Sequence, residues 1–428
     1  MFAIVDINNF YASCERIFDP KLRNKPVAVL SNNDGCIIAR SNEAKKLGIK
    51  MGQVFFEKEN WLKKQGVAVL SSNYPLYADM SNRMVQVLRE MVDDIIIYSI
   101  DEVFIDLSSY KNKDLRLLAF EIKDKLLKYL GLPVSVGIAP TKTLAKTANF
   151  YAKRYSKFKN VLVFDEEQKI KDALKLIDVG EIWGIGRRFK KFLKANGIKS
   201  ALDLRNANEQ FIKKHMSVVG LRTVKELKEE SCIEVESIRK DRKNMAHTRT
   251  FKHPIKTKED LKAIISTFTV RLTEKLRFQK SAANMIGVFV ETSRFENKKY
   301  RYYNSKTVNL TVPSNDTFEL IKYALKLTDA IFVSGYKYKR AGVMVFGLQN
   351  SNHLQYSLFD TINRYRNNKI LNTLDFLNAS YGRDVVKYAV QGDDTKNSVQ
   401  ERLSPQYTTS WNQIIGARAD ENFPHVPS

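Results

Sequence analysis

The spacing of apolar and polar positions predicts an α/β arrangement over roughly the first 165 residues. Short apolar runs rich in β-branched residues are typical of buried strands, and they occur at 2–7, 26–31, 95–107 and 134–138. Helical periodicity lies between and after these runs, at 8–15, 41–47, 77–92, 114–130 and 142–155. Asn8 or Asn9 is a candidate N-cap, and Gly48 is a candidate stop signal. Strands separated by helices indicate an α/β core.

The pattern changes twice further along the chain. Residues 170–235 form short helical segments, and strands rich in aromatic and basic residues return over 243–348, with helical periodicity at 258–277 and 316–333. The last 75 residues contain clusters of Asn, Ser, Gln and Pro and give no clear element. The chain has 428 residues. At roughly 100–200 residues per domain, we expect several domains.

Positive charge is concentrated in the middle of the chain. The 71 Lys and Arg residues exceed the 47 Asp and Glu residues by 24. Residues 101–230 have a net charge of +10 and residues 231–350 of +12, whereas residues 1–100 have +2 and the remainder is balanced. Such a region attracts nucleic acid, because neutralised phosphates release condensed counterions. A solvated basic surface is the alternative, and a membrane surface is disfavoured because the charge is not confined to one amphipathic helix.

Several classes of protein are disfavoured by what the sequence lacks. No apolar run approaches the ~18 residues of a membrane span, and the N-terminus reaches Asp6 without a preceding basic region, unlike a signal peptide. Cys14, Cys36 and Cys232 are odd in number and far apart, which favours a reducing, cytoplasmic location over a disulfide framework. The sequence has neither zinc-ligand spacing nor a P-loop.

Three acids are the strongest candidates for chemistry. Asp6 ends the first predicted strand, and Asp101 and Glu102 lie at the junction of two strand-like runs. Phosphoryl transfer with two divalent cations needs carboxylates that converge from separate strands. Adjacent residues of a regular strand point to opposite faces, so Asp101 and Glu102 can share a metal site only if the backbone bends there. Solvated turn acids are the alternative interpretation.

Two further patterns are weaker. Lys45, beside Asn42, and Lys153 could hold a triphosphate, or they could be solvated helix lysines. The glycines at 184 and 186, next to Trp183 and two arginines, could form a hairpin whose amides approach a DNA phosphate. A plain turn after a helix is the alternative.

Taken in order along the chain, these residues resemble the motifs of Y-family translesion DNA polymerases, and more narrowly of the UmuC-type catalytic subunit of bacterial DNA polymerase V. The resemblance extends almost from end to end. Its most specific stretches are residues 6–15, 30–40, 77–81, 98–102, 141–146, 183–187 and 403–409.

The resemblance implies a multidomain α/β and α+β fold of the right-hand polymerase type. Residues 1–20 and 75–165 would form the palm, 21–74 small fingers, 166–235 a helical thumb, 240–350 an α+β little finger and 351–428 a C-terminal tail. The implied activity is error-prone, template-directed DNA synthesis opposite damaged bases, which is translesion synthesis in SOS mutagenesis, by two-metal-ion nucleotidyl transfer. The alternatives are a non-catalytic DNA-binding subunit and another palm-fold nucleotidyl transferase such as a cyclase.

Site residues carry over by matching position. Asp6, Asp101 and Glu102, with the Ile7 carbonyl, would bind two Mg²⁺ ions, one acting on the primer 3′-hydroxyl and the other on the phosphates. Tyr11 would be the steric gate against a 2′-hydroxyl. The nucleotide-binding positions are Phe10, Asn42, Lys45 and Lys153, of which Asn42 departs from the Tyr of many relatives. The DNA-binding positions are Gly184, Gly186, Arg187 and Arg188.

The resemblance also implies partners besides primer-template DNA and deoxynucleotides. The peptide 355–359 is explained by core packing when taken alone, but relatives bind the sliding clamp at this place, which implies clamp contacts by Gln355, Leu358 and Phe359. A UmuD-type dimer and the RecA recombinase are expected on the tail, with association with the nucleoid when active.

Overall fold

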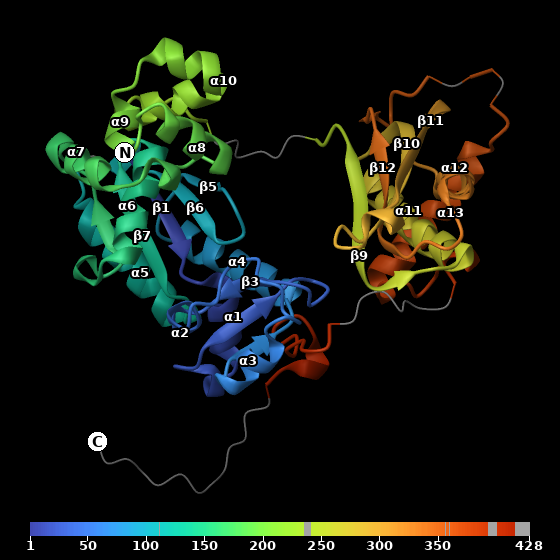
Figure 1. Cartoon of the computed structure of the whole chain (residues 1–428), viewed down its shortest axis with the longest axis horizontal. Helices are drawn as coiled ribbons and strands as arrows, with labels where there is room; N and C mark the ends of the chain where they lie inside the picture. Colours follow the sequence, from blue (N-terminus) through green and yellow to red (C-terminus); the bar gives the residue numbers. More distant parts are fainter. Residues whose placement is uncertain (111, 235–240, 356, 359, 393–399, 416–428) are drawn as a thin grey trace, which may run out of the picture. The chain divides into compact units, whose positions relative to one another are not determined.

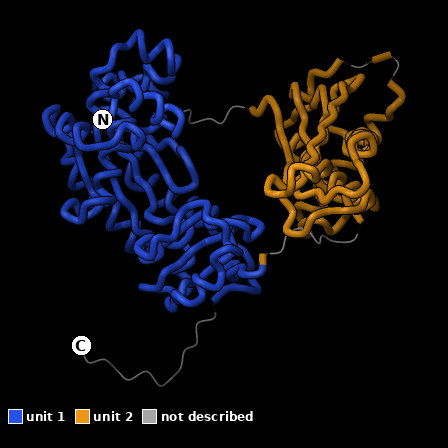
Figure 2. The backbone as a smooth tube through the Cα atoms, viewed as in Figure 1, with its two compact units in different colours: residues 1–238, 401–428 blue, residues 239–400 orange. Residues whose placement is uncertain are grey.

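The structure is a computed structural model that describes residues 1–110, 112–234, 241–355, 357–358, 360–392 and 400–415. The chain forms two compact units, coloured separately in Figure 2. Unit 1 comprises residues 1–238 and 401–428, and unit 2 comprises residues 239–400. Unit 2 is therefore an insertion in the sequence of unit 1.

Unit 1 is built on a five-stranded sheet (Figure 1). Its strands follow the order β5 (Ile95–Ile97), β6 (Glu102–Asp106), β1 (Phe2–Ile7), β7 (Val134–Ala139) and β8 (Val161–Val163). Neighbouring strands are antiparallel except β7 and β8, which are parallel. The strands predicted at 2–7, 95–107 and 134–138 are confirmed.

Helices cover both faces of this sheet. Ala3 and Val5 pack into one core with α1 (Phe10–Phe18), α4 (Tyr74–Arg89) and α5 (Leu115–Leu130). Ile4 lies in a second core with α6 (Lys142–Arg154). Successive strand residues point to opposite faces, so each of these apolar strands serves both cores. The predicted helices at 77–92, 114–130 and 142–155 are confirmed, with small differences at their ends.

A smaller sheet with its own core lies in the first 75 residues. β3 (Ile37–Arg40), β2 (Val27–Leu30) and β4 (Ala68–Leu70) pair in that order. The helices α2 (Asn42–Lys46) and α3 (Glu59–Lys64) contribute Ala44 and Leu62 to its core. The predicted strand at 26–31 and helix at 41–47 are confirmed, and Gly48 adopts the positive φ of 80° that suits a helix end.

Short helices follow, as predicted for residues 170–235. They are α7 (Glu167–Leu176), α8 (Arg187–Ala195), α9 (Ala201–Arg205) and α10 (Glu209–Leu227), and they share the core of α6. The longest, α10, is kinked at Ser217, whose φ is 64°.

Unit 2 is a four-stranded antiparallel sheet with helices on one face. Its strand order is β11 (Tyr303–Ser314), β10 (Ser281–Thr292), β12 (Tyr338–Phe346) and β9 (Met245–Ile255), and β13 (Gln349–Asn350) pairs with the start of β10. The helices α11 (Lys258–Phe278) and α12 (Thr317–Ile331) bury their apolar stripes against it. The strands and both helices predicted for 243–348 are confirmed.

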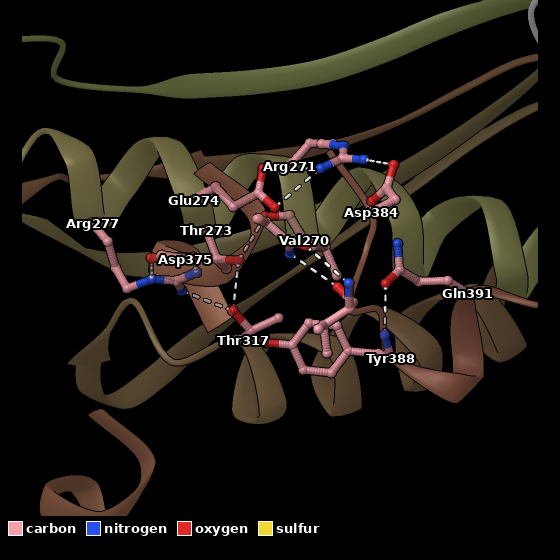
Figure 3. Close-up of polar contacts among 12 residues, drawn as sticks. Val270, Arg271, Thr273, Glu274, Arg277, Thr317, Asp375, Asp384, Tyr388 and Gln391 are labelled. Atoms are coloured by element: carbon pink, nitrogen blue, oxygen red, sulfur yellow. Dashed lines mark hydrogen bonds and ion pairs between the residues drawn. The ribbon is translucent and has the colours of Figure 1, made fainter. Parts of the chain in front are cut away.

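The last region of the chain, which gave no clear pattern, is divided between the two units. Its helix α13 (Arg364–Tyr381) packs on unit 2, where Asp375 accepts two hydrogen bonds from Arg277, of 2.6 and 2.7 Å (Figure 3). Nearby, Arg271 forms an ion pair with Asp384. Residues 401–415 belong to unit 1 instead. In the described part of the chain, no helix combines the length and apolar character needed to cross a membrane.

Candidate active site

The three predicted acids meet at the edge of one pocket. Asp6 lies opposite Glu102 in the pairing of β1 with β6, and the Ile7 amide donates to the Asp101 carbonyl over 3.0 Å. Asp101 precedes β6, in the turn that joins it to β5, so the strand alternation that would separate it from Glu102 does not apply. Asp6, Asp101 and Glu102 therefore line the same cavity.

That cavity has a volume of about 480 Å³ and brings opposite charges together. The acids come from β1 and from the β5–β6 hairpin, and the cations from β3, α2 and α6. Eight predicted site residues line it, namely Asp6, Ile7, Phe10, Tyr11, Lys45, Asp101, Glu102 and Lys153, and so do Asn9 and Arg40. A site that holds both carboxylates and cations can bind both divalent metals and phosphates.

Lysines of α6 hold two of the acids. Lys153 Nζ lies 2.5 Å from Asp6 Oδ1, and Lys146 Nζ lies 2.8 Å from Glu102 Oε1. Asn149 of the same helix also donates to Asp6 over 3.2 Å. Sequence reasoning gave no role to Lys146 or Asn149. Their spacing with Lys153, at i, i+3 and i+7, places all three on one helix face and is the signal that could have identified them.

The electrostatics of Asp6 reflect its burial. The pKa of Asp6 is raised to about 6, mainly by loss of solvent on burial; the neighbouring Glu102 and Asp101 act in the same direction and Lys153 acts in the opposite one. A cation beside Asp6 favours its charged form. Burial disfavours the charged form of Asp6, and the ion pair with Lys153 offsets part of that cost.

Oxygen donors of this kind fit Mg²⁺, which binds carboxylates and carbonyls. Within the described ranges, however, no three carboxylate, imidazole or thiol groups lie close enough together to bind one metal ion as they stand. Each acid has another partner, because Asp101 accepts from the Ser99 hydroxyl over 2.6 Å and the other two bind lysines. Metal binding would therefore exchange these partners for the ion.

Lys146 connects the acids to the helical region. Its ammonium lies 4.5 Å from the centre of the Tyr98 ring and 5.5 Å from that of Trp183. The Trp183 indole N–H donates to the Tyr98 hydroxyl over 3.0 Å. The segment before α8 thus contacts the cation that holds Glu102.

Asn9 links two of the predicted nucleotide-binding residues. Its side-chain amide donates to Asn42 over 3.0 Å and accepts from Lys45 over 2.5 Å. Asn9 precedes α1 in a left-handed conformation, with φ of 52°, and its side chain does not cap the helix. The structure places Asn42 outside the cavity lining, behind Asn9. The sequence suggested a helix-cap role for Asn9, and it gave no sign that the Asn9 side chain bridges Asn42 and Lys45.

An aromatic cluster forms the other side of the cavity. The Tyr11 ring stacks on that of Tyr77, with centroids 4.4 Å apart and planes at 13°. Phe10 lies 5.4 Å from Tyr11, and Tyr74 meets Tyr11 edge-on at 6.0 Å. Such stacking holds a ring in one orientation.

The remaining predicted residues lie elsewhere. Gly184, Gly186, Arg187 and Arg188 are exposed at and before the start of α8 and do not line the cavity. In unit 2, Gln355 is exposed and the Leu358 side chain is fully so. Phe359 lies outside the described residues.

Comparison with solved structures shows the class of fold. A "Y-family DNA polymerase chimera Dbh-Dpo4(243-245)-Dbh" matches with a TM-score of 0.64 at 23% sequence identity, covering 81% of this chain and 99% of that one. An insertion ternary complex of Dbh DNA polymerase matches with a TM-score of 0.52 at the same identity and coverage. The fold is that of a Y-family DNA polymerase.

Sequence comparison gives the branch. The protein UmuC of Salmonella typhimurium strain LT2 is 41% identical over 422 residues, covering 97% of this chain and 99% of that protein. DNA polymerase IV 1 of Bacillus subtilis strain 168 is 25% identical over 90% of this chain and 91% of its own. The impB/mucB/samB family model matches residues 5–149, its C-terminal domain model matches 242–358, and a domain of unknown function matches 368–417. The chain belongs to the impB/mucB/samB family, as a UmuC-type Y-family polymerase.

Proposed function

We infer that this chain is a template-directed DNA polymerase that inserts deoxynucleotides opposite damaged template bases. The observation that carries this inference is the convergence of three acids, three cations and an ordered tyrosine on one cavity. Identity to UmuC over nearly the whole chain supports translesion synthesis as the activity.

We propose that Asp6, Asp101 and Glu102, with the Ile7 carbonyl, hold two Mg²⁺ ions. These donors are oxygen atoms, which Mg²⁺ prefers as ligands. They come from two separate strands and the turn between β5 and β6. When bound, the ions would neutralise the charge of the phosphates and lower the pKa of the primer 3′-hydroxyl. Until then, Lys153 pairs with Asp6 and Lys146 pairs with Glu102.

The cations that line the cavity would orient the incoming nucleotide. Lys45 and Lys153, with Arg40 beside them, line the cavity and can pair with triphosphate oxygens. Asn9 positions Lys45 through a 2.5 Å hydrogen bond. Burial, with the positive charges of Arg40 and Lys153, lowers the pKa of Lys45, so an anion at this place would be stabilised.

Tyr11 would select the sugar. Its ring lines the same cavity as Asp6 and Asp101, and stacking on Tyr77 holds it in place. A fixed ring at the sugar position excludes a 2′-hydroxyl by volume. Phe10, next to it at the start of α1, is buried and supports this wall.

The DNA contacts would come from two places. The exposed residues Gly184 and Gly186 leave backbone amides open to phosphate, and Arg187 and Arg188 add charge in the first turn of α8. The excess of basic residues over 231–350 adds a sequence-independent attraction to the duplex.

For partners, we propose the sliding clamp, a UmuD-type dimer and RecA. The exposure of Gln355 and Leu358 suits a peptide that inserts apolar side chains into a pocket of a clamp. We also propose that the protein acts in the cytoplasm, at the nucleoid, because its proposed substrate is DNA.

Primer extension across a template abasic site tests the function. Wild-type chain is compared on damaged and undamaged templates, with and without a UmuD-type dimer and RecA. Insertion opposite the abasic site is the expected result. Tight primer-template binding with no synthesis under any condition would instead indicate a non-catalytic DNA-binding subunit.

A further inference from the structure

Residues 401–407, here called the clasp, return from unit 2 to pack on unit 1. In Figure 1 this red segment lies beside α1 and α3. The Ser71 amide, just after β4, donates to the Arg402 carbonyl over 2.9 Å, and the Arg402 amide donates to the Ser71 hydroxyl over 3.1 Å. Asp34 accepts hydrogen bonds from the Glu401 amide and from Ser71, of 3.0 and 2.9 Å. The backbone of the clasp is thus bound at its start.

The centre of the clasp is buried against α4. Ser404 is 8% exposed and Asn73, which precedes α4, is fully buried. The Asn73 side-chain amide lies 2.9 Å from the Ser404 hydroxyl and 3.1 Å from the Pro405 carbonyl. The Asn73 side chain also accepts from the Leu76 amide and so caps α4. One side chain therefore fixes both the clasp and the start of the helix that carries Tyr77.

A buried acid connects the clasp to Tyr77. Glu15 of α1 is 1% exposed and accepts a hydrogen bond from the Tyr77 hydroxyl over 2.5 Å. Burial raises the pKa of Glu15, and the neighbouring hydroxyls of Tyr77 and Ser404 act in the opposite direction. Three residues after Ser404, the Tyr407 ring stacks on Phe18 of the same helix α1, with centroids 4.9 Å apart. Two helices that meet the active site, α1 and α4, are held by these contacts.

Tyr77 in turn packs directly against Tyr11. Their rings are 4.4 Å apart and nearly parallel, and Tyr77 is fully buried. The hydroxyl of Tyr77 is fixed by Glu15, so its ring cannot move away from this position without breaking a buried hydrogen bond. A continuous set of contacts runs from Ser404 to Asn73, whose carbonyl accepts from the Tyr77 amide over 3.0 Å, and from Tyr77 to the ring that lines the cavity.

We propose that the clasp is part of the catalytic unit and that Ser404 is a positioning residue, which acts through Asn73 and Tyr77 to hold Tyr11 for sugar discrimination. The clasp lies within the match to a domain of unknown function, and this proposal gives that segment a role. Because Tyr11 selects the sugar only under the function proposed above, the role of the clasp rests on that function.

The test is the ratio of deoxynucleotide to ribonucleotide insertion efficiency, measured with the full chain on an undamaged primer-template. We expect Ser404→Ala to lower this ratio roughly tenfold, the scale of one lost buried hydrogen bond. Tyr77→Phe, which keeps the stacked ring but loses the hydroxyl, should act in the same direction. Ser404→Thr should retain the ratio, and Thr409→Ala, at an exposed position beyond the clasp, is the matched control.

A structural role alone gives a different pattern. If Ser404→Ala and Tyr77→Phe reduce both efficiencies equally and leave the ratio unchanged, the positioning role is wrong. The double variant Tyr11→Ala with Ser404→Ala should discriminate no less than Tyr11→Ala alone, since both act on one ring. Additive losses would overturn the proposal.

Tyr11→Ala separates the two levels of inference. If it does not relax sugar discrimination, the steric-gate assignment fails and the clasp proposal fails with it. If Tyr11→Ala relaxes discrimination while the Ser404 and Tyr77 variants do not, only the clasp proposal fails.

Discussion

Asp6 and Glu102 lie directly opposite each other in the antiparallel pairing of β1 and β6, and each carboxylate binds a different lysine of α6. Residues so paired point to the same face, so two negative charges are neighbours in a site that is shielded from water. The lysines offset that repulsion. The same charge balance would shift when a divalent cation enters.

Lys146→Met tests whether a divalent cation can replace the lysine as the partner of Glu102. Without Mg²⁺ the variant loses the partner of Glu102, and we expect a loss of about 1–2 kcal/mol in the free energy of unfolding, less than for a fully buried pair. Saturating Mg²⁺ should stabilise the variant more than wild type, because the cation then relieves unbalanced charge. Thermal unfolding with and without Mg²⁺ measures both quantities.

The control for Lys146→Met is Lys171→Met, since Lys171 pairs with the exposed Glu167 on α7. It should leave the effect of Mg²⁺ on thermal unfolding unchanged. Equal stabilisation of wild type and Lys146→Met by Mg²⁺ would argue against a metal at Glu102.

The two glycines before α8 should respond differently to substitution. Gly184 has φ of 88°, a conformation that costs an alanine about 1 kcal/mol, whereas a Cβ on Gly186 would meet no atom within 4 Å. We expect Gly184→Ala to lower stability and Gly186→Ala to preserve it. If DNA phosphate approaches this hairpin closely, Gly186→Ala should still weaken primer-template binding. Calorimetry and a DNA-binding titration separate these effects, and unchanged DNA affinity for both variants would remove the hairpin from the interface.

Replacing Leu358 and Phe359 with Ala should abolish stimulation of synthesis by the clamp and spare synthesis without it. Leu358 is fully exposed and has no packing to lose in unit 2. Phe376→Ala is the matched control, because Phe376 is an exposed apolar side chain of unit 2, on α13. Primer extension with and without the clamp is the measurement. An equal loss in both assays would point to misfolding rather than to a clamp contact.

His247 should make the stability of unit 2 depend on pH. Burial in β9, together with nearby cations, lowers its pKa from 6.5 to about 4. Those cations are Lys275 and Arg271 of α11, Arg249 of β9 and Arg383 after α13, and the acids that line the same cavity are Glu274, Asp375 and Asp384. Between pH 6.5 and 4 the unfolded chain binds more protons, so stability falls as the pH falls through this window.

His247→Gln should remove that part of the pH dependence. The expected contribution is about 1–2 kcal/mol, because the ring is only partly buried and solvent screens its neighbours. Calorimetric unfolding at pH 7.5, 6 and 5 measures it, with His253→Gln, an exposed site on the same strand, as the control. Parallel pH curves for wild type and His247→Gln would contradict the assignment.

The sequence predicted most of the elements that form the active site, because their signals are local. The hydrophobic periodicity predicts strand β1 and helix α6. A metal site at Asp101 and Glu102 required a bend in the backbone between them, and the structure has a turn there that lets both line one cavity. The acids themselves were identifiable as costly residues in apolar strands.

Contacts between distant residues could not be predicted in this way. Asn73 and Ser404 are 331 residues apart, and nothing in the sequence around either residue indicates that the two are in contact. The sequence predicted Asn9 as a helix cap, whereas in the structure its side chain accepts a hydrogen bond from Lys45, which is distant in the sequence. The division of the last 75 residues between two units likewise depends on ion pairs with α11 and on hydrogen bonds with the β4–α4 segment, which only the fold brings into reach.

The central claim is that Asp6, Asp101 and Glu102 form the metal-dependent catalytic centre. Single-turnover insertion of one deoxynucleotide, titrated with Mg²⁺, tests it most directly for wild type, Asp101→Asn and Asp106→Asn. Asp106 lies at the other end of β6, opposite Phe2, and is the control. We expect Asp101→Asn to slow insertion by at least about a hundredfold at saturating Mg²⁺ with primer-template affinity retained, and Asp106→Asn to behave as wild type. Insertion by Asp101→Asn at the wild-type rate and Mg²⁺ dependence would contradict the account.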